Sequence, residues 1–335
     1  MSIRRAASPN YTARKLTDRL MRGLTVLATL LAVVPLVIII GYVLIKGGSS
    51  LNIPFFTQTY QAPVTLGDLG DAGIDPATGL PAVPEIDPVT GLPVVPTTVP
   101  DGTQPPAEQT PVAEPAAQGG VLHSIVGTLL ITGLALLFAL PVGLMAGIFL
   151  SEFPANPVAT FVRFCCDVLS GAPSIIVGVV GYVLVVQRAG TYSGLAGAIA
   201  LTFLMVPTIT RTTEEILKLV PNATREAALA MGAPMWYSTF TVVIPAALSG
   251  IVTGVLLAFS RGAGETAPLL LTVGGSNVLS FNVRDQMDAL PLRTYYFTNS
   301  PFPAEYNQAW GTAFVLTAMV LLVNVLVRLA TRRRG

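Results

Sequence analysis

Several apolar runs in this chain are long enough to cross a lipid bilayer, and they limit the folds that it can adopt. A helix needs roughly 20 apolar residues to cross about 30 Å of hydrocarbon, where the structure itself must satisfy every backbone polar group. With 52% hydrophobic and 11% charged residues, the 335-residue chain is too apolar for a soluble domain. We therefore predict an all-α integral membrane protein with six transmembrane helices. The predicted spans are Leu24–Ile45, His123–Leu150, Phe164–Val186, Leu195–Thr210, Ala246–Val273 and Trp310–Ala330.

Basic residues gather on one side of these spans. Six spans place both termini on the same side, and both are basic: residues 1–23 hold six Lys or Arg and residues 331–335 hold three. Cytoplasmic loops carry an excess of Lys and Arg. With both termini in the cytoplasm, 14 basic residues face the cytoplasm, four face outward and Arg261 lies inside a span. We predict a multi-pass protein in contact with membrane lipid, with both termini cytoplasmic.

The segment 46–120 differs in composition from the rest of the chain. It holds 13 of the 27 prolines, and eight acidic residues against one lysine. Such segments bury too little apolar surface to fold. Residues 74–84 are echoed twelve residues later by residues 86–96, and two short copies do not build a repeat domain. We expect a disordered extracytoplasmic spacer; the alternative is a docking or ion-binding element for an extracytoplasmic partner.

These features divide the chain into five parts. They are a basic tail (1–23), a first transmembrane helix (24–45), the Pro-rich loop (46–120), a five-helix core (121–330) and a second basic tail (331–335).

The sequence shows no sign of a catalytic, cofactor or metal site. The two cysteines, Cys165 and Cys166, are adjacent, where a disulfide is strained and metal-ligand spacing is absent. No Gly-x-x-x-x-Gly-Lys-Ser/Thr motif occurs to cradle ATP phosphates, and a net charge of +1 does not indicate a nucleic acid partner. We predict that the chain is not an enzyme and that any ATPase is a separate polypeptide.

The loop between the fourth and fifth spans, residues 221–245, holds the most informative motif. Asn222 or Thr224 can cap a short helix there, and Gly232 is expected to end it. The apolar members of this helix are Ala227, Ala228, Leu229 and Met231. An apolar helix on a cytoplasmic loop indicates docking into a partner's groove; the alternative is an interfacial helix without a partner.

This loop resembles the EAA loop of bacterial ABC importer permeases. The family's pattern is Glu-Ala-Ala, three residues, Gly, nine residues and then Ile-x-Leu-Pro. The matching residues are Glu226, Ala227, Ala228, Gly232, Val242, Ile244 and Pro245, with conservative changes at Val242 and Ile244. The resemblance implies the type I (MetI-like) permease fold. It also implies that Glu226, Ala227, Ala228, Gly232 and Pro245 couple the chain to a cytoplasmic ATPase.

A polar patch interrupts the fifth span. A charge at the bilayer centre costs roughly 2.5–3.5 kcal/mol on insertion scales, so charges there are usually functional. Arg261 and Glu265 are four residues apart and can partly offset each other. Because Arg binds oxyanions bidentately, an anion is the expected cargo. We predict that Arg261, Glu265 and Thr266 line the substrate pathway; the alternative for Arg261 is a structural counter-charge.

Two segments resemble the PstA family of phosphate permeases. They are the run from Arg261 through Gly264-Glu265-Thr266-Ala267-Pro268 to Thr272, and Leu169–Gly178 in the third span. The resemblance covers residues from about Val121 to the C-terminus and implies a phosphate pathway past Arg261 and Glu265 in a prokaryotic plasma membrane. It implies three partners: a PstC-type second permease, a PstB-type ATPase dimer and a PstS-type phosphate-binding protein.

Three alternatives stay open from the residues alone. One is an ABC permease for sulfate, molybdate or phosphonate. Another is an ion-coupled secondary transporter, although no inverted repeat is evident. The third is a membrane sensor or scaffold, which leaves the Glu-Ala-Ala loop unexplained.

The remaining polar residues are assigned ordinary roles. His123 is expected to be solvated at a membrane boundary, and Asp167 to pair with Arg163, with a pathway role as the alternative for Asp167. Glu214 and Glu215, with Arg211 and Lys218, are expected on a solvated helical extension, with contact to the ATPase as the alternative. Ser170, Pro173 and Ser174 are expected to break or kink the third span.

Overall fold

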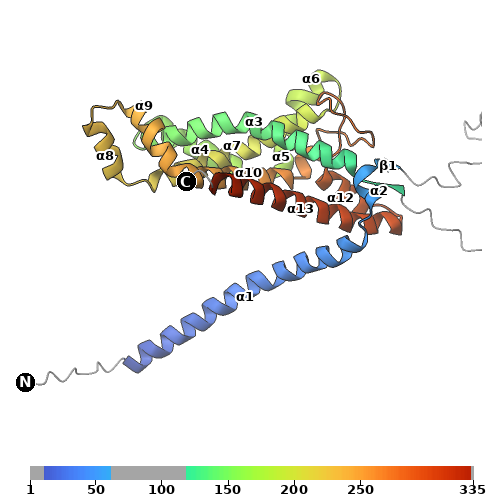
Figure 1. The fold of residues 1–335 in the computed structure, drawn as a ribbon, viewed down its shortest axis with the longest axis horizontal. Helices are drawn as coiled ribbons and strands as arrows, with labels where there is room; N and C mark the ends of the chain where they lie inside the picture. Colours follow the sequence, from blue (N-terminus) through green and yellow to red (C-terminus); the bar gives the residue numbers. More distant parts are fainter. Residues whose placement is uncertain (1–10, 62–117, 333–335) are drawn as a thin grey trace, which may run out of the picture.

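The computed structural model describes residues 11–61 and 118–332 and is almost entirely helical (Figure 1). The α-helices are α1 (Tyr11–Ser49), α2 (Ile53–Thr57), α3 (Leu122–Glu152), α4 (Pro157–Gly171), α5 (Ser174–Gly181), α6 (Gln187–Ala189), α7 (Gly194–Lys218), α8 (Asn222–Ala230), α9 (Met235–Ser238), α10 (Ile244–Ala263), α11 (Ala267–Leu270), α12 (Leu290–Thr298) and α13 (Pro303–Arg332). Two π-helical segments, η1 (Tyr182–Val186) and η2 (Thr239–Val243), continue α5 and precede α10. The strands β1 (Tyr60–Gln61) and β2 (Gln118–Gly119) form one antiparallel pair. The predicted all-α class is confirmed.

Within the described residues, five helical runs are long and apolar enough to cross a membrane. They are α1, α3, α7, the run from α9 through α10, and α13. The pair formed by α4 and the run 174–189 also passes this test, but its two halves are bent by 102°. If the bent pair is counted as one span, the structure has six candidate spans within the described residues, which is the number predicted.

The bend lies inside the predicted third span, between α4 and α5. Ala172 has extended backbone angles (φ −69°, ψ 136°), as residues before proline usually do. Pro173 has no N–H to donate, so the helical hydrogen bonds cannot continue across it. The expected kink is therefore a full break, and the third span is two helices rather than one.

The bundle is organised around α7. Of the 18-residue apolar window in α7, 61% is buried, against 33% in α3. Glycines of α3 face α7: an added Cβ at Gly143 would lie 2.8 Å from the Ile209 Cβ atom, and one at Gly147 would lie 2.6 Å from the Thr213 Cβ atom. Small residues let membrane helices approach closely. The largest buried cluster accordingly joins α3, α7, α10 and α11.

The first helix lies apart from the bundle. Figure 1 shows α1 diverging from the other helices, and none of its apolar window is buried. It meets α13 near its C-terminal end, where the Tyr42 and Trp310 rings are edge to face with centroids 4.8 Å apart. The apolar side chains along α1 are otherwise exposed, where a bilayer would cover them.

Both described ends of the segment 46–120 are folded, unlike the disorder expected from its composition. Asn52 caps α2 by accepting a hydrogen bond from the Phe55 N–H at 2.8 Å, and Phe55 is 1% exposed. Tyr60 pairs with Gly119 and Gln61 with Gln118. The prediction used the average composition of the whole segment, which does not reveal that α2 and the β1–β2 pair form at its two ends. The repeat at 74–96 lies outside the described residues.

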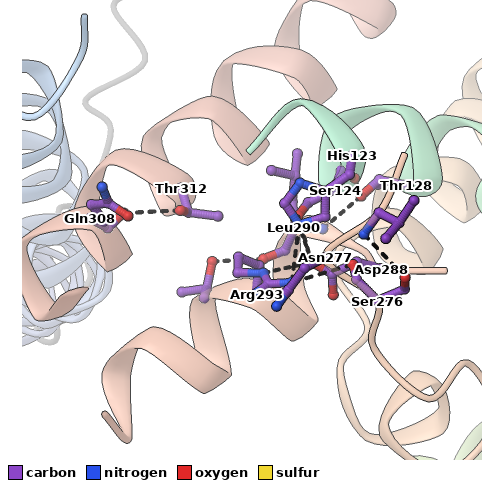
Figure 2. Close-up of polar contacts among 12 residues, drawn as sticks. His123, Ser124, Thr128, Ser276, Asn277, Asp288, Leu290, Arg293, Gln308 and Thr312 are labelled. Carbon is purple, nitrogen blue, oxygen red and sulfur yellow. Dashed lines mark hydrogen bonds and ion pairs between the residues drawn. The ribbon is translucent and has the colours of Figure 1, made fainter. Parts of the chain in front are cut away.

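A buried polar cluster ties the same end of the bundle together (Figure 2). The Asp288 carboxylate, before α12, accepts hydrogen bonds from the Arg293 Nε at 2.7 Å and the Ser124 hydroxyl at 2.6 Å. Arg293 also donates to the Asn277 side chain at 2.7 Å. Its guanidinium lies 4.9 Å from the Tyr60 ring centroid. The cluster thus joins α3, α12, the loop before α12 and β1.

His123 belongs to this cluster, so the prediction of a solvated side chain was wrong. It is 3% exposed, and its Nε2 lies 3.0 Å from Arg293 Nη2. The partners that bury it lie about 165–170 residues away in the sequence. The hydropathy of the residues next to His123 in the sequence therefore does not indicate that Asp288 and Arg293 bury it.

We predict that Asp288→Asn destabilises the protein by roughly 3–5 kcal/mol, because it leaves the buried Arg293 charge uncompensated. The measurement is thermal unfolding of the purified protein at neutral pH. The control is Asp18→Asn, which removes a pair whose side chains are 65% and 80% exposed and should have almost no effect. Equal unfolding temperatures for the two variants would contradict this role.

The contribution of Asp288 to stability should depend on pH, because the groups around its carboxylate shift its pKa. Burial raises the pKa of Asp288, but the contact with His123, the Arg293 charge and the Ser124 hydrogen bond outweigh burial and lower it. The stabilisation by ionised Asp288 should therefore be complete above its ordinary pKa of 3.8. It should be lost as the pH falls through the lower pKa that Asp288 has in the folded protein. The difference in stability between the wild type and Asp288→Asn should shrink in that acid range.

The β1–β2 pair also predicts the result of shortening the Pro-rich loop. Because the pairing holds the two ends of the loop together, deletion of residues 73–96 should leave folding and transport nearly intact. Transport by the deletion variant at matched expression tests this. Lost transport at normal expression would instead favour the docking alternative.

Candidate functional site

The long helix that carries Arg261 ends two residues later, unlike the predicted continuous span to Val273. α10 ends at Ala263, and α11 begins at Ala267. Glycine is a poor helix former, and Pro268 cannot donate a helical hydrogen bond, so Gly264 and Pro268 together favour a break. The N–H groups of Gly264 and Glu265 donate 3.2 Å bonds to the carbonyls of residues 261 and 262, which tightens the last turn.

The break brings the predicted pathway residues together at the end of α10. The Arg261 Nε lies 3.7 Å from the Glu265 Oε1, and the two side chains are 47% and 19% exposed. Thr266 follows and is half-buried. The predicted contact between Arg261 and Glu265 is therefore present, but it spans the helix end rather than a continuous helical face. A loose, half-exposed guanidinium retains hydrogen-bond donors for an anion.

A second broken helix packs against the first. An added Cβ at Gly178 of α5 would lie 2.9 Å from the Pro268 Cα of α11. One at Gly181 would lie 3.2 Å from the Thr272 Cγ2. Non-helical backbone at membrane depth is tolerated where protein buries it or where it lines a cavity. Broken helices of this kind form the ion and substrate sites of other transporters.

A polar contact fixes the neighbouring helix at the same level. The Asn324 side chain of α13 donates to the Ser260 hydroxyl at 2.7 Å and to the Val320 carbonyl at 2.8 Å. Ser260 directly precedes Arg261. The contact therefore ties α13 to the end of α10 that carries the charged pair.

The Glu-Ala-Ala loop projects from the opposite end of the bundle to β1 and β2 (Figure 1). It contains α8, none of whose residues is buried, and then Gly232 with a left-handed φ of +83°. Met231 is 88% exposed, and within the described residues the Glu226 side chain has no hydrogen bond or ion pair. Pro245 lies where the π-helical segment η2 passes into α10, inside one continuous helical run from Met235 to Ala263.

One face of α8 lines an open hollow. Its volume is about 560 Å³, and its lining residues are Ala223, Thr224, Ala227, Ala228, Met231 and Val242. Exposed apolar surface of this kind marks an interaction site. Ala227 and Ala228, the two alanines predicted to couple the chain to an ATPase, line this hollow, whereas Glu226 does not.

The acidic residue Glu214 is buried, contrary to the prediction of a solvated extension. Its side chain is 2% exposed and is surrounded by cations: Arg163 at 2.7 Å, Lys218 at 2.6 Å and Arg211 at 3.3 Å. The prediction that Asp167 pairs with Arg163 was also wrong, because Asp167 pairs with Arg211. α4 packs against α7, so its charged residues meet partners on α7 rather than on their own helix.

The cysteines and metal-binding groups add no further site. Cys165 is half-buried and Cys166 buried, and both are free thiols. Among residues 11–61 and 118–332, no group of three or more His, Cys, Asp or Glu side chains is placed to hold a metal ion.

Broken membrane helices and an exposed Glu-Ala-Ala loop together define a transporter permease subunit. The family described as "Binding-protein-dependent transport system inner membrane component" matches residues 139–333. The solved structure titled "Inward facing conformations of the MetNI methionine ABC transporter" matches with a TM-score of 0.51 and 21% identity. It covers 64% of this chain and 93% of that one. This similarity confirms the MetI-like fold.

Closer relatives identify the branch of the family. "Phosphate transport system permease protein PstA" of Haemophilus influenzae is 42% identical over 216 residues, which are 64% of this chain and 77% of the relative. "Phosphate transport system permease protein PstA 1" of Mycobacterium tuberculosis (strain H37Rv) is 39% identical over 222 residues, which are 64% of this chain and 72% of the relative. The chain belongs to the PstA family of inner membrane permeases.

Proposed function

We propose that the chain is the transmembrane permease subunit of an ATP-driven importer of inorganic phosphate. The observation that carries the proposal is the match to PstA relatives over about three quarters of their length. The exposed α8 supports it, because the loop that resembles the EAA motif presents an open apolar face. ATP would be hydrolysed by a separate subunit.

We infer that the α8 end of the bundle faces the cytoplasm of a prokaryotic cell. Figure 1 places the C-terminal end of α13 toward that end, and α1 runs back toward the same side from the end that leads into α2. Both basic tails would then lie in the cytoplasm, in agreement with the excess of Lys and Arg there. The β1–β2 pair and the Asp288 cluster would lie on the outer face.

The proposed complex contains three further kinds of subunit. A PstB-type ATPase dimer would bind α8, with Glu226, Ala227, Ala228 and Gly232 at the contact. A PstC-type permease would complete the pathway, and a PstS-type protein would deliver phosphate to the outer face. The exposed apolar face of α8 supports the first contact.

The Arg261–Glu265 pair supports an oxyanion as cargo. Arg261 is 47% exposed and its partner Glu265 is 3.7 Å away, so an incoming phosphate can compete for the guanidinium donors. Glu265 offsets the arginine charge and so limits how tightly the anion is held. Closure of the ATPases would move α8 and alternate the opening of the pathway between the two sides.

The first test is uptake of radiolabelled phosphate into proteoliposomes that contain this chain with its co-purifying subunits. We predict ATP-dependent uptake that excess sulfate and molybdate do not compete away. Glu226→Lys should abolish uptake, because it reverses the charge on the exposed face of α8. Competition by sulfate or molybdate would favour another oxyanion, and uptake driven by an ion gradient without ATPase would contradict the proposal.

We also predict that Arg261→Gln abolishes phosphate uptake while the complex still assembles. The change removes the cation and its guanidinium donors but keeps a polar, uncharged and shorter side chain. The measurement is uptake at equal amounts of purified complex. The control is Arg22→Gln, which alters an arginine that is 80% exposed and should leave uptake unchanged. Normal uptake by the Arg261 variant would remove this residue from the mechanism.

A further inference from the structure

A single side chain of α8 makes polar contacts with the rest of the bundle. Arg225 forms an ion pair with the Glu152 carboxylate at the end of α3. Its Nη2 also donates to the Leu217 carbonyl, in the last turn of α7, at 2.8 Å. Among the described residues, no other α8 side chain has a hydrogen bond or ion pair. The pair is mostly shielded from water, since its side chains are 19% and 8% exposed.

Two hollows border this pair. One of about 310 Å³ and a smaller one of about 100 Å³ are both lined by Arg225, Glu152 and Met235. Packing between α8 and the end of α3 is therefore incomplete at this point, whereas α8 contacts η2 and α9 directly. Among the described residues, the ion pair is the polar side-chain contact that joins α8 to α3.

A second arginine continues the connection from α3 to α4. Arg163 donates to the Leu150 carbonyl at 2.9 Å and to the Pro154 carbonyl at 3.2 Å, so it grips the end of α3 beside Glu152. Its Nε bonds to the buried Glu214 of α7 at 2.7 Å. A movement of the end of α3 thus acts on α4, and α4 leads directly to the break at Pro173.

We propose that the Arg225–Glu152 pair transmits movement of α8 to α3 and, through Arg163, to the broken span. This inference rests on the proposed function, since it assumes that an ATPase moves α8. In this role both residues act through the helices that they join, so both are positioning residues. Without the pair, no polar side-chain contact among the described residues would link α8 to α3, so movement of α8 would reach α3 less effectively and ATP hydrolysis would continue without transport.

The test is the number of phosphate ions imported per ATP hydrolysed by the reconstituted complex. Glu152→Gln and Arg225→Gln should each lower this ratio, by roughly 2- to 30-fold, the range typical of changes along a coupling route. Because the two residues act as one unit, the double variant should lower the ratio no further than either single variant. Arg22→Gln, at an exposed ion pair, is the matched control and should keep the wild-type ratio.

The ratio separates coupling from a merely structural role. A structural role would reduce the amount of complex but leave the ratio unchanged, and that result would overturn the inference. Additive losses in the double variant would also overturn it. If the neutral variants fail to assemble, Glu152→Asp withdraws the carboxylate by one methylene; a lowered ratio supports the inference and a wild-type ratio overturns it.

The same experiment distinguishes this inference from the function on which it rests. A wild-type complex that imports phosphate with ATP, together with variants that keep its ratio, contradicts only the role of the pair. A wild-type complex that shows no ATP-driven phosphate uptake contradicts the proposed function itself.

Discussion

The close contact between α7 and its neighbours is the constraint on which the rest of the bundle depends. In lipid there is little hydrophobic gain from burying one helix against another, so packing relies on small residues that let backbones approach. Gly143 and Gly147 provide this on α3. On α10, an added Cβ at Gly250 would lie 2.5 Å from the Ile216 Cγ2. Both α3 and α10 thus pack glycines against α7, and the broken segments are held against the same helix.

Polar groups in the bundle are concentrated where helices end or break. The Asp288–Arg293 cluster lies at one end, the Glu214 and Glu152 ion pairs lie at the other, and the Arg261–Glu265 pair lies at the break between α10 and α11. The two end clusters are mostly buried and paired, whereas Arg261 is half-exposed. Burial of a paired charge fixes geometry, and exposure leaves a charge available for an exchangeable ligand.

Features formed by residues close together in the chain could be predicted from the sequence, whereas contacts between residues far apart in the chain could not. The apolar runs, the short helix with Gly232 after it, and the Arg261–Glu265 contact all follow from residues within a few positions of one another. The burial of His123 does not, because Asp288 and Arg293 reach it from the far end of the chain. Glu214 was likewise expected in solvent because its helix is polar there, yet α4 folds back and supplies Arg163. The break after Ala263 was open to prediction from Gly264 and Pro268, but the surrounding apolar run masked it.

The two-residue β1–β2 pair has a consequence for how the Pro-rich segment can vary between relatives. Once the ends of an insertion are fixed beside each other, each doubling of a flexible loop adds only about 0.6 kcal/mol of closure entropy. Tyr60 and Gly119 supply that fixed point, and Phe55 anchors the chain just before it. Sequence drift, duplication or a whole inserted domain between Gln61 and Gln118 is therefore thermodynamically cheap, which makes this position the natural place for such proteins to diversify.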